Sequence, residues 1–229
     1  MTYQNFSLAQ LQAIDGAHHL HPFTDHKDLR AAGARMITHA KGPFIYDSED
    51  NEILDGMAGL WCVNIGYGRD ELAEAAYAQM KELPYYNSFF RCSTPTPVLL
   101  SQKLAEISPQ NLNQVFYGSS GSEANDTALR LVRHYWALGG KPQKNRVISR
   151  QSAYHGSTIA GTSLGGMNAM HGQLHGAVPN IAHVMMPYAY ELQHAGESDH
   201  DFGLRAAKAV EDEILRAGGF TTGGTNFDA

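Results

Sequence analysis

The stretch that decides the fold runs from Gln114 to Tyr135 and reads QVFYGSSGSEANDTALRLVRHY. Its first apolar residues, Val115 to Tyr117, are typical of a short buried strand. The small residues from Gly118 to Ser122 then allow a tight backbone turn and a close approach to a ligand. From Glu123 onward, apolar residues recur at helical spacing and share one face. These residues are Ala124, Ala128, Leu131 and Tyr135.

A strand, a Gly/Ser loop and a helix in this order can hold a phosphate group. Free N–H groups and the positive end of the helix dipole point toward the bound anion. The dipole contributes only about 0.3–1 kcal/mol at an exposed site, so N–H groups and serine hydroxyls must supply most of the binding. Ser120 and Glu123 also match a capping box, with which any helix can begin. The P-loop and dinucleotide motifs are absent here, which argues against those two kinds of site.

The composition of the 229 residues indicates an ordinary globular protein, with 43% hydrophobic and 17% charged residues. A net charge of −6 gives no basic surface for nucleic acid or an anionic membrane. Cys62 and Cys92 are too few for a disulfide framework and suit a reducing compartment. We see no signal peptide and no apolar run long enough to span a bilayer. We therefore expect a cytoplasmic protein with no nucleic-acid or membrane partner.

The remaining chain alternates between helical and strand patterns. Helices are expected over residues 3–16, 70–81, 97–107 and 202–216, a small antiparallel meander over 35–54, and strands over 146–149 and 181–187. Strands that alternate with helices from residue 114 onward predict an α/β layer with a largely parallel sheet. Tyr154 and His155 follow the strand at 146–149, where open α/β sheets place ligand contacts. They could equally be part of a hydrogen-bonded loop without chemistry.

Three other features have both a functional and a structural interpretation. Four histidines gather near the N-terminus, but no Cys or Glu stands at matching spacing and Pro22 interrupts any regular face, so we expect no metal site. These are His18, His19, His21 and His26. Trp61 ends a glycine-rich loop and could pack in a core. The aromatic run over residues 84–90 could line a ligand site or a subunit interface.

Three segments resemble class III aminotransferases, which are pyridoxal phosphate (PLP) enzymes of fold type I. They are DGMAGLWCVNIGYG at 55–68, SGSEANDT at 120–127 and YHGST at 154–158. The resemblance covers about residues 5–213 in unbroken order and is strongest to ω-amino acid, polyamine and amine:pyruvate transaminases. It implies an N-terminal α+β segment over residues 1–65, part of the PLP-binding large domain over 66–213, and an atypical Gly/Thr-rich tail over 214–229.

The resemblance also implies which residues hold the cofactor. Ser120, Gly121 and Ser122 match the family's cup for the PLP phosphate. Tyr154 matches the aromatic residue that stacks on the pyridine ring and borders the substrate, and His155 follows it in the same cofactor-binding motif.

Further residues match the substrate pocket and the subunit contact of the family. Phe23 and Trp61 match pocket walls that favour apolar amine substituents. Phe89 matches a residue that reaches the phosphate site of the neighbouring subunit, which implies a homodimer with shared active sites. The implied reaction moves an amino group from an amine or ω-amino acid to pyruvate or another 2-oxo acid.

Two groups that this chemistry needs are not found. One is a desolvated lysine that forms a Schiff base with PLP, and the other is a carboxylate at the pyridine nitrogen. All lysines lie in polar or turn-like stretches, namely Lys27, Lys41, Lys81, Lys103, Lys141, Lys144 and Lys208. The family places both groups after the third strand, so we expect the chain to stop before them and to be inactive alone. The alternative is a non-catalytic fragment that binds phosphate or PLP weakly, or associates with a full-length partner.

The tail departs from the family pattern. Residues 218–228 read GGFTTGGTNFD and resemble a barrel strand of xylose isomerases, which indicates a recombined reading frame. An ordinary divergent Gly/Thr-rich tail is the alternative. A sugar isomerase would need paired carboxylates and histidines for two metal ions, and the sequence shows none arranged in that way.

Overall fold

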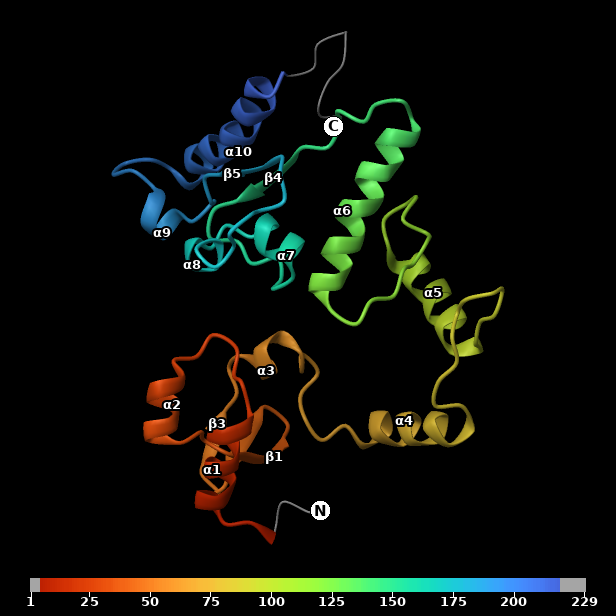
Figure 1. Ribbon diagram of the computed structural model, residues 1–229, viewed down its shortest axis with the longest axis vertical. Helices are drawn as coiled ribbons and strands as arrows, with labels where there is room; N and C mark the ends of the chain where they lie inside the picture. Colours follow the sequence, from red (N-terminus) through yellow and green to blue (C-terminus); the bar gives the residue numbers. More distant parts are fainter. Residues whose placement is uncertain (1–4, 219–229) are drawn as a thin grey trace. The chain divides into compact units, whose positions relative to one another are not determined.

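The computed structural model describes residues 5–218 of the chain (Figure 1). The chain divides into two compact units, residues 1–98 and residues 99–229, and each is described by itself below. The boundaries expected from the sequence, after residues 65 and 213, stay predictions. The isomerase-like segment falls almost entirely on residues 219–229, which lie outside the described residues.

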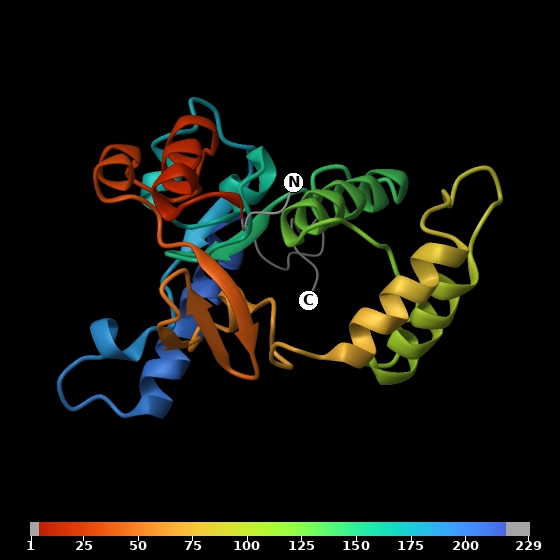
Figure 2. The same cartoon turned by 90° about the horizontal axis from the view of Figure 1, so that it is seen from below.

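The first unit contains a small sheet and several helices. Their bounds are α1 (Leu8–His18), α2 (His26–Ala32), β1 (Ile37–Lys41), β2 (Phe44–Asp47), β3 (Glu52–Leu54), α3 (Ala58–Trp61) and α4 (Asp70–Glu82). The strands pair antiparallel in the order β1-β2-β3, visible as the twisted ribbon of arrows in Figure 2, so the predicted meander is confirmed. The β2–β3 turn is held by Asp47, whose carboxylate accepts hydrogen bonds from the N–H groups of Glu49 (3.0 Å) and Asn51 (3.1 Å).

Helix α1 begins later than the sequence pattern predicts. Ser7 caps it, since its Oγ accepts a hydrogen bond from Gln10 N at 3.3 Å and Gln10 Oε1 accepts one from Ser7 N at 2.8 Å. This reciprocal capping box satisfies two N–H groups at the helix start and fixes that start at Leu8.

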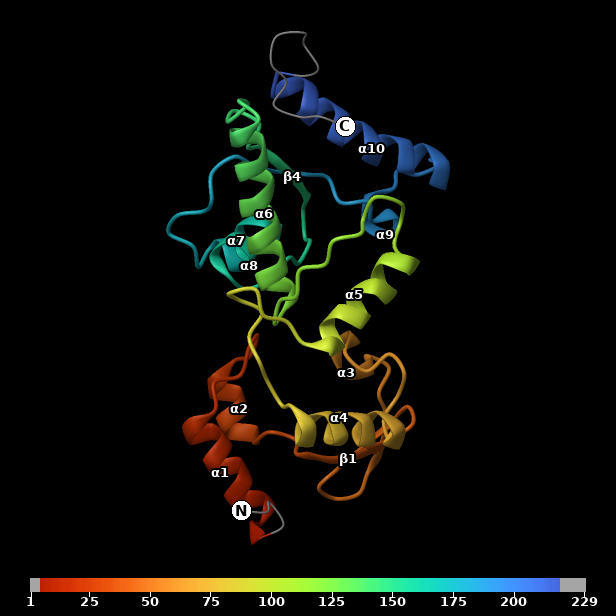
Figure 3. The same ribbon diagram turned by 90° about the vertical axis from the view of Figure 1, so that its right-hand side faces the viewer.

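The second unit contains a parallel strand pair with helices on both sides. Its elements are α6 (Gly121–Leu138), β4 (Val147–Arg150), α7 (Ile159–Leu164), α8 (Asn168–His171), β5 (Ile181–Val184), α9 (Ala189–Leu192) and α10 (Asp199–Arg216), while α5 (Pro95–Ile107) crosses the boundary. Strands β4 and β5 pair in parallel, with Val147 opposite Ile181. Helices α7 and α8 lie on one side of this pair and α10 lies on the other (Figures 1 and 3).

The buried apolar residues of the described chain gather around this strand pair. They are Leu129, Leu164, Val184, Phe202 and Ala206. Arg150 ties β4 to the neighbouring segments, since its Nη1 donates to the carbonyls of Met185 (2.7 Å) and Ala206 (2.9 Å). The predicted α/β layer with a parallel sheet is therefore confirmed, and it places the end of β4 beside α7.

The predicted strand over Val115 to Tyr117 is wrong. These residues form no strand, and Phe116 and Tyr117 are exposed. A strand needs a neighbouring strand to satisfy its N–H and C=O groups, and no strand within residues 5–218 pairs with this segment. Strand β5 is also shorter than predicted and ends at Val184. Within residues 5–218, no helix combines the length and the apolar character needed to cross a bilayer.

Candidate active site

The predicted phosphate cup lies at the start of α6. Ser120 has an extended backbone (φ −158°, ψ 161°), and its Oγ accepts a hydrogen bond from Glu123 N at 3.1 Å. The Glu123 carboxylate accepts from Ser119 N at 2.7 Å rather than from Ser120 N, so the capping box is displaced by one residue. The N–H groups of Gly121 and Ser122 have no hydrogen-bond partner within residues 5–218.

This donor set fits a phosphate group. Two free N–H groups stand at the positive end of an 18-residue helix, where an anion is stabilised. A Cβ placed on Gly121 would meet no atom within 4 Å, so space for a ligand is open there. Residues Ser120, Gly121 and Ser122 therefore present N–H groups and hydroxyls that suit an anionic group, as the sequence predicts.

The loop after β4 is fixed to the first turns of α6 by side chains of the helix. Asn125 Nδ2 donates to the carbonyl of His155 at 2.8 Å. Asp126 Oδ1 accepts from Thr158 Oγ1 at 2.6 Å and from Gly161 N at 3.1 Å. Because the loop is held at several points, His155 is brought to the helix that carries the predicted phosphate cup.

The same loop approaches the helix most closely at Gly156. Ser157 N donates to Ser122 Oγ at 3.2 Å. Gly156 has a φ of +125°, and a Cβ added to it would lie 2.5 Å from Ser122 Oγ and 2.8 Å from Ser122 Cα. Only glycine combines this backbone conformation with this close approach. The structure thus brings the predicted residues 120–122 and the 154–158 motif together.

His155 also borders a pocket of about 330 Å³ between α6, β4 and α7. Its other lining residues are mainly apolar, namely Asn125, Ala128, Leu129, Val132, Val147, Ile148, Ser149 and Leu164. The Oγ of Ser149 is buried and makes no hydrogen bond within residues 5–218. Tyr154 precedes His155 in the loop, and its side chain is exposed.

The three aromatic residues predicted for the substrate pocket and the subunit contact belong to the first unit. Phe23, Trp61 and Phe89 are 71%, 82% and 68% exposed. Phe23 and Trp61 have left-handed backbones, with φ of 49° and 67°, and Phe90, beside Phe89, has a φ of 56°. Such conformations are costly for bulky residues and persist only where the surroundings impose them.

Asp55 organises the loop that carries Trp61. Its Oδ2 accepts hydrogen bonds from Gly59 N (2.7 Å) and from the Tyr67 hydroxyl (2.8 Å), and its Oδ1 accepts from Met57 N (3.2 Å). The hydrogen bond from Tyr67 lowers the pKa of the Asp55 carboxyl and raises the pKa of the Tyr67 hydroxyl. The ionised carboxylate of Asp55 therefore holds the backbone of the family-like segment 55–68 in place.

Sequence reasoning missed Asn125 and Asp126 as supporting residues. The available signal was a pair of polar side chains in the second turn of a helix that follows a ligand-binding loop. Their partners lie 30 and more residues further on, so only the fold identifies them.

Most of the lysines are exposed, as their polar and turn-like sequence surroundings indicate. All are exposed except Lys144, which is 4% exposed and precedes β4. Its Nζ lies 4.1 Å from the centre of the Trp136 ring. Lys144 does not follow a buried strand into a glycine-rich loop, so it lacks the placement expected of a lysine that binds PLP covalently.

Comparisons with known proteins agree with this arrangement. The family model "Aminotransferase class-III" matches residues 28–217. The chain is 53% identical over 214 residues to a putrescine–pyruvate aminotransferase of Pseudomonas aeruginosa, covering 93% of this chain and 47% of that protein. It is 42% identical over 189 residues to a diaminobutyrate–2-oxoglutarate transaminase of Halomonas elongata, covering 82% of this chain and 40% of that protein.

Solved structures show the same similarity. An (S)-enantioselective ω-transaminase from Thermomicrobium roseum superposes with a TM-score of 0.87 at 39% identity, covering 93% of this chain and 47% of that chain. An ω-transaminase from Pseudomonas jessenii in complex with PMP superposes with a TM-score of 0.87 at 35% identity, covering 91% and 46%. The chain thus spans about half the length of the relatives it matches.

These matches confirm the resemblance seen in the sequence and assign the fold to the large domain of PLP-dependent transferases of fold type I. With the match over residues 28–217 and a relative at 53% identity, this chain belongs to the class III aminotransferases, a PLP-dependent family.

Proposed function

We propose that this chain contributes the phosphate anchor and the aromatic pocket residues of an ω-transaminase. The reaction would move an amino group from an amine or ω-amino acid to pyruvate or another 2-oxo acid. The observation that carries the proposal is the start of α6, where Gly121 and Ser122 present free N–H groups. Bound PLP supplies an electron sink for the electrons of the substrate's amino-bearing carbon.

Each side chain has a defined task in this proposal. The N–H groups of Gly121 and Ser122 bind and orient the phosphate. Tyr154 offers an aromatic face to the flat ring and borders the substrate. Phe23 and Trp61 exclude water from the apolar part of the amine, and their imposed left-handed backbones support a role at a ligand site.

The named relatives support a proposal for the substrate class. The putrescine–pyruvate aminotransferase at 53% identity supports a diamine as donor and pyruvate as acceptor. We further propose a cytoplasmic homodimer, in which Phe89 contacts the phosphate site of the other subunit. The exposed aromatic residues near Phe89 in the sequence support such a contact. They are Tyr85, Tyr86 and Phe90.

We also propose that these 229 residues do not transaminate alone. The lysines other than Lys144 are exposed to solvent rather than held in the dry pocket that activates an amine as a nucleophile. Lys144 is buried, but it lies in the turn before β4 rather than after a strand.

The test measures PLP binding, covalent attachment and turnover separately. Equimolar PLP should bind through its phosphate, whereas pyridoxal, which lacks the phosphate, should bind much more weakly. Borohydride reduction followed by intact mass should reveal no stoichiometric adduct, and putrescine with pyruvate should yield no alanine. A stoichiometric adduct mapped to one lysine would overturn the proposed inactivity. Equal affinity for PLP and pyridoxal would overturn the phosphate anchor.

A second candidate is a non-catalytic segment that associates with a full-length partner. It is supported by apolar residues on α6 that are exposed in this chain, namely Leu131, Val132, Tyr135 and Leu138. Size-exclusion chromatography separates the two candidates. A single sharp peak of the purified chain favours a competent folded unit, while a broad distribution that sharpens on adding a full-length homologue favours association.

A further inference from the structure

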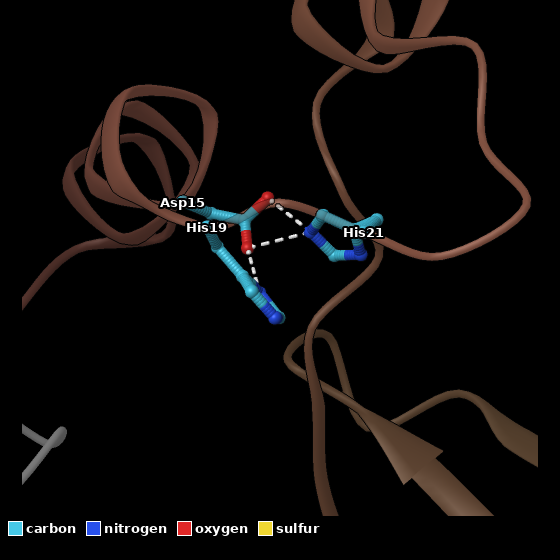
Figure 4. A group of neighbouring side chains, drawn as sticks. All are labelled: Asp15, His19 and His21. Atoms are coloured by element: carbon cyan, nitrogen blue, oxygen red, sulfur yellow. Dashed lines mark hydrogen bonds and ion pairs between the residues drawn. The ribbon is translucent and has the colours of Figure 1, made fainter. Parts of the chain in front are cut away.

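We infer that Asp15, His19 and His21 form a binding site for a divalent transition-metal ion of the zinc class. The one carboxylate and two imidazoles converge at the C-terminal end of α1 (Figure 4). One potential ligand atom from each residue lies within 4.8 Å of the other two.

The convergence arises from the way α1 ends. Asp15 lies in the last turn of the helix, and its carbonyl accepts a hydrogen bond from His19 N at 2.9 Å. His19 leaves the helix with an extended backbone (φ −107°, ψ 121°), so the chain turns back past the Asp15 side chain. His21 then approaches the same carboxylate from the loop, as Figure 4 shows.

Both imidazoles point a nitrogen at the same carboxylate oxygen. His19 Nδ1 lies 3.0 Å and His21 Nε2 lies 2.9 Å from Asp15 Oδ1. Donors around a tetrahedral Zn²⁺, at about 2.0–2.2 Å from the ion, are roughly 3.3 Å apart. Each nitrogen therefore needs to move only a few tenths of an ångström away from Asp15 Oδ1 to reach the spacing of zinc ligands.

The donor chemistry selects the class of ion. Imidazole nitrogens with one carboxylate suit Zn²⁺, Co²⁺, Ni²⁺ and Fe²⁺, whereas Mg²⁺ and Ca²⁺ prefer oxygen ligands alone. Three protein ligands leave a further coordination position for water. The Asp15 side chain is 13% exposed, that of His21 24% and that of His19 63%, so an ion can enter from solvent beside His19.

The sequence did not predict this site. Cys and Glu were considered as further ligands beside the histidines, but the third ligand is Asp15, which stands four residues before His19 and six before His21. A bound ion would cross-link the end of α1 to the loop that leads to Phe23. The inference concerns structure and does not depend on the proposed transaminase activity.

The experiment uses the full 229-residue chain without a histidine tag and without PLP. Cys62→Ser and Cys92→Ser are introduced first, because both thiols are free and would compete for soft metal ions. The chain is treated with chelator, then titrated with Co²⁺ by visible absorption and with Zn²⁺ by calorimetry. We expect one ion per chain and a cobalt spectrum of low coordination number.

Matched variants assign the site. Asp15→Asn and His21→Ala should each weaken Zn²⁺ binding by roughly tenfold or more, while His18→Ala, which removes a neighbouring histidine outside the cluster, should leave it unchanged. Circular dichroism confirms that each variant stays folded. Hydrogen exchange of the parent chain should also slow over residues 19–23 when Zn²⁺ is added. Absence of stoichiometric binding, or equal loss in the His18→Ala variant, would overturn the inference.

Discussion

Gly156 lies so close to Ser122 that a methyl group on Gly156 would stand 2.5 Å from the serine Oγ. Ser157 N also donates to that Oγ at 3.2 Å. The loop after β4 and the start of α6 are therefore joined by one contact, which positions residues 120–122 and the 154–158 motif together.

Replacing Gly156 tests this contact. Gly156→Ala should destabilise the chain by about 1–3 kcal/mol, because the side chain meets Ser122 and the φ of +125° disfavours a Cβ. PLP affinity should fall with it. Urea denaturation and PLP titration measure the two effects.

Gly203→Ala is the matched control, since this glycine lies inside α10 and its Cβ would meet no atom within 4 Å. It should raise stability by about 0.4–1 kcal/mol. Equal stability of the two variants would contradict the close approach at Gly156.

The hydrogen bond between Asp126 and Thr158 should contribute to the stability of the second unit. Asp126→Ala leaves Thr158 Oγ1 without its acceptor and removes one of the two acceptors of Gly161 N, so it should cost about 1–3 kcal/mol. Thr158→Val removes the same bond and also the N-cap of α7, in which Thr158 Oγ1 accepts from Gly161 N at 3.1 Å, so it should cost a similar amount. In a double-mutant cycle measured by urea denaturation, the combined variant should cost less than the sum of the two. Strict additivity would show that the two residues do not interact.

The ion pair between Glu197 and Arg205 should make the free energy of unfolding depend on pH in the acidic range. Arg205 Nε and Nη2 donate to the two carboxylate oxygens of Glu197, each at 2.8 Å, and this pair lowers the pKa of Glu197 from 4.5 to about 2. A depressed folded-state pKa gives stability that is complete above pH 4.5 and is lost as pH falls toward 2.

Glu197→Gln should therefore flatten the pH dependence of the unfolding midpoint between pH 4.5 and 2, the range set by the two pKa values. Glu191→Gln, which removes an exposed carboxylate of α9, should retain the dependence of the parent chain. Urea midpoints at several pH values provide the comparison. Parallel curves for the parent and Glu197→Gln would rule the pair out as the source.

The hydrogen bond from the Tyr67 hydroxyl to Asp55 should hold the loop of Trp61. Tyr67→Phe removes the donor and should cost about 0.5–1.5 kcal/mol. In a Trp136→Phe background, the fluorescence anisotropy of Trp61 alone reports on the mobility of the loop and should fall. Tyr77→Phe, on the exposed face of α4, is the matched control and should leave the anisotropy unchanged.

Sequence periodicity predicted the elements whose formation depends mainly on local pattern. The β1–β3 meander, α4, α6, β4 and α10 all appear within a few residues of the expected bounds. The resemblance identified the family and both halves of the contact between residues 120–122 and 154–158.

The errors concern interactions between distant residues. Val115 to Tyr117 have the composition of a strand, but pairing depends on a neighbouring strand that the pattern cannot supply. His21 reaches Asp15 because the chain leaves the helix at His19 with an extended backbone, and no residue type in this segment predicts that change of direction. Asn125 and Asp126 hydrogen-bond to residues 155–161, and their spacing in the sequence does not predict that these residues lie nearby.

The left-handed run from Ala58 to Trp61 has a consequence for enzyme engineering. Ala58, Gly59, Leu60 and Trp61 have φ between 48° and 67°. Glycine and asparagine adopt this conformation at little cost, whereas valine, isoleucine and threonine are strongly disfavoured. Randomised libraries at position 61 should therefore be enriched in folded Gly and Asn variants before any ligand is screened, because the backbone conformation limits which residues the position accepts.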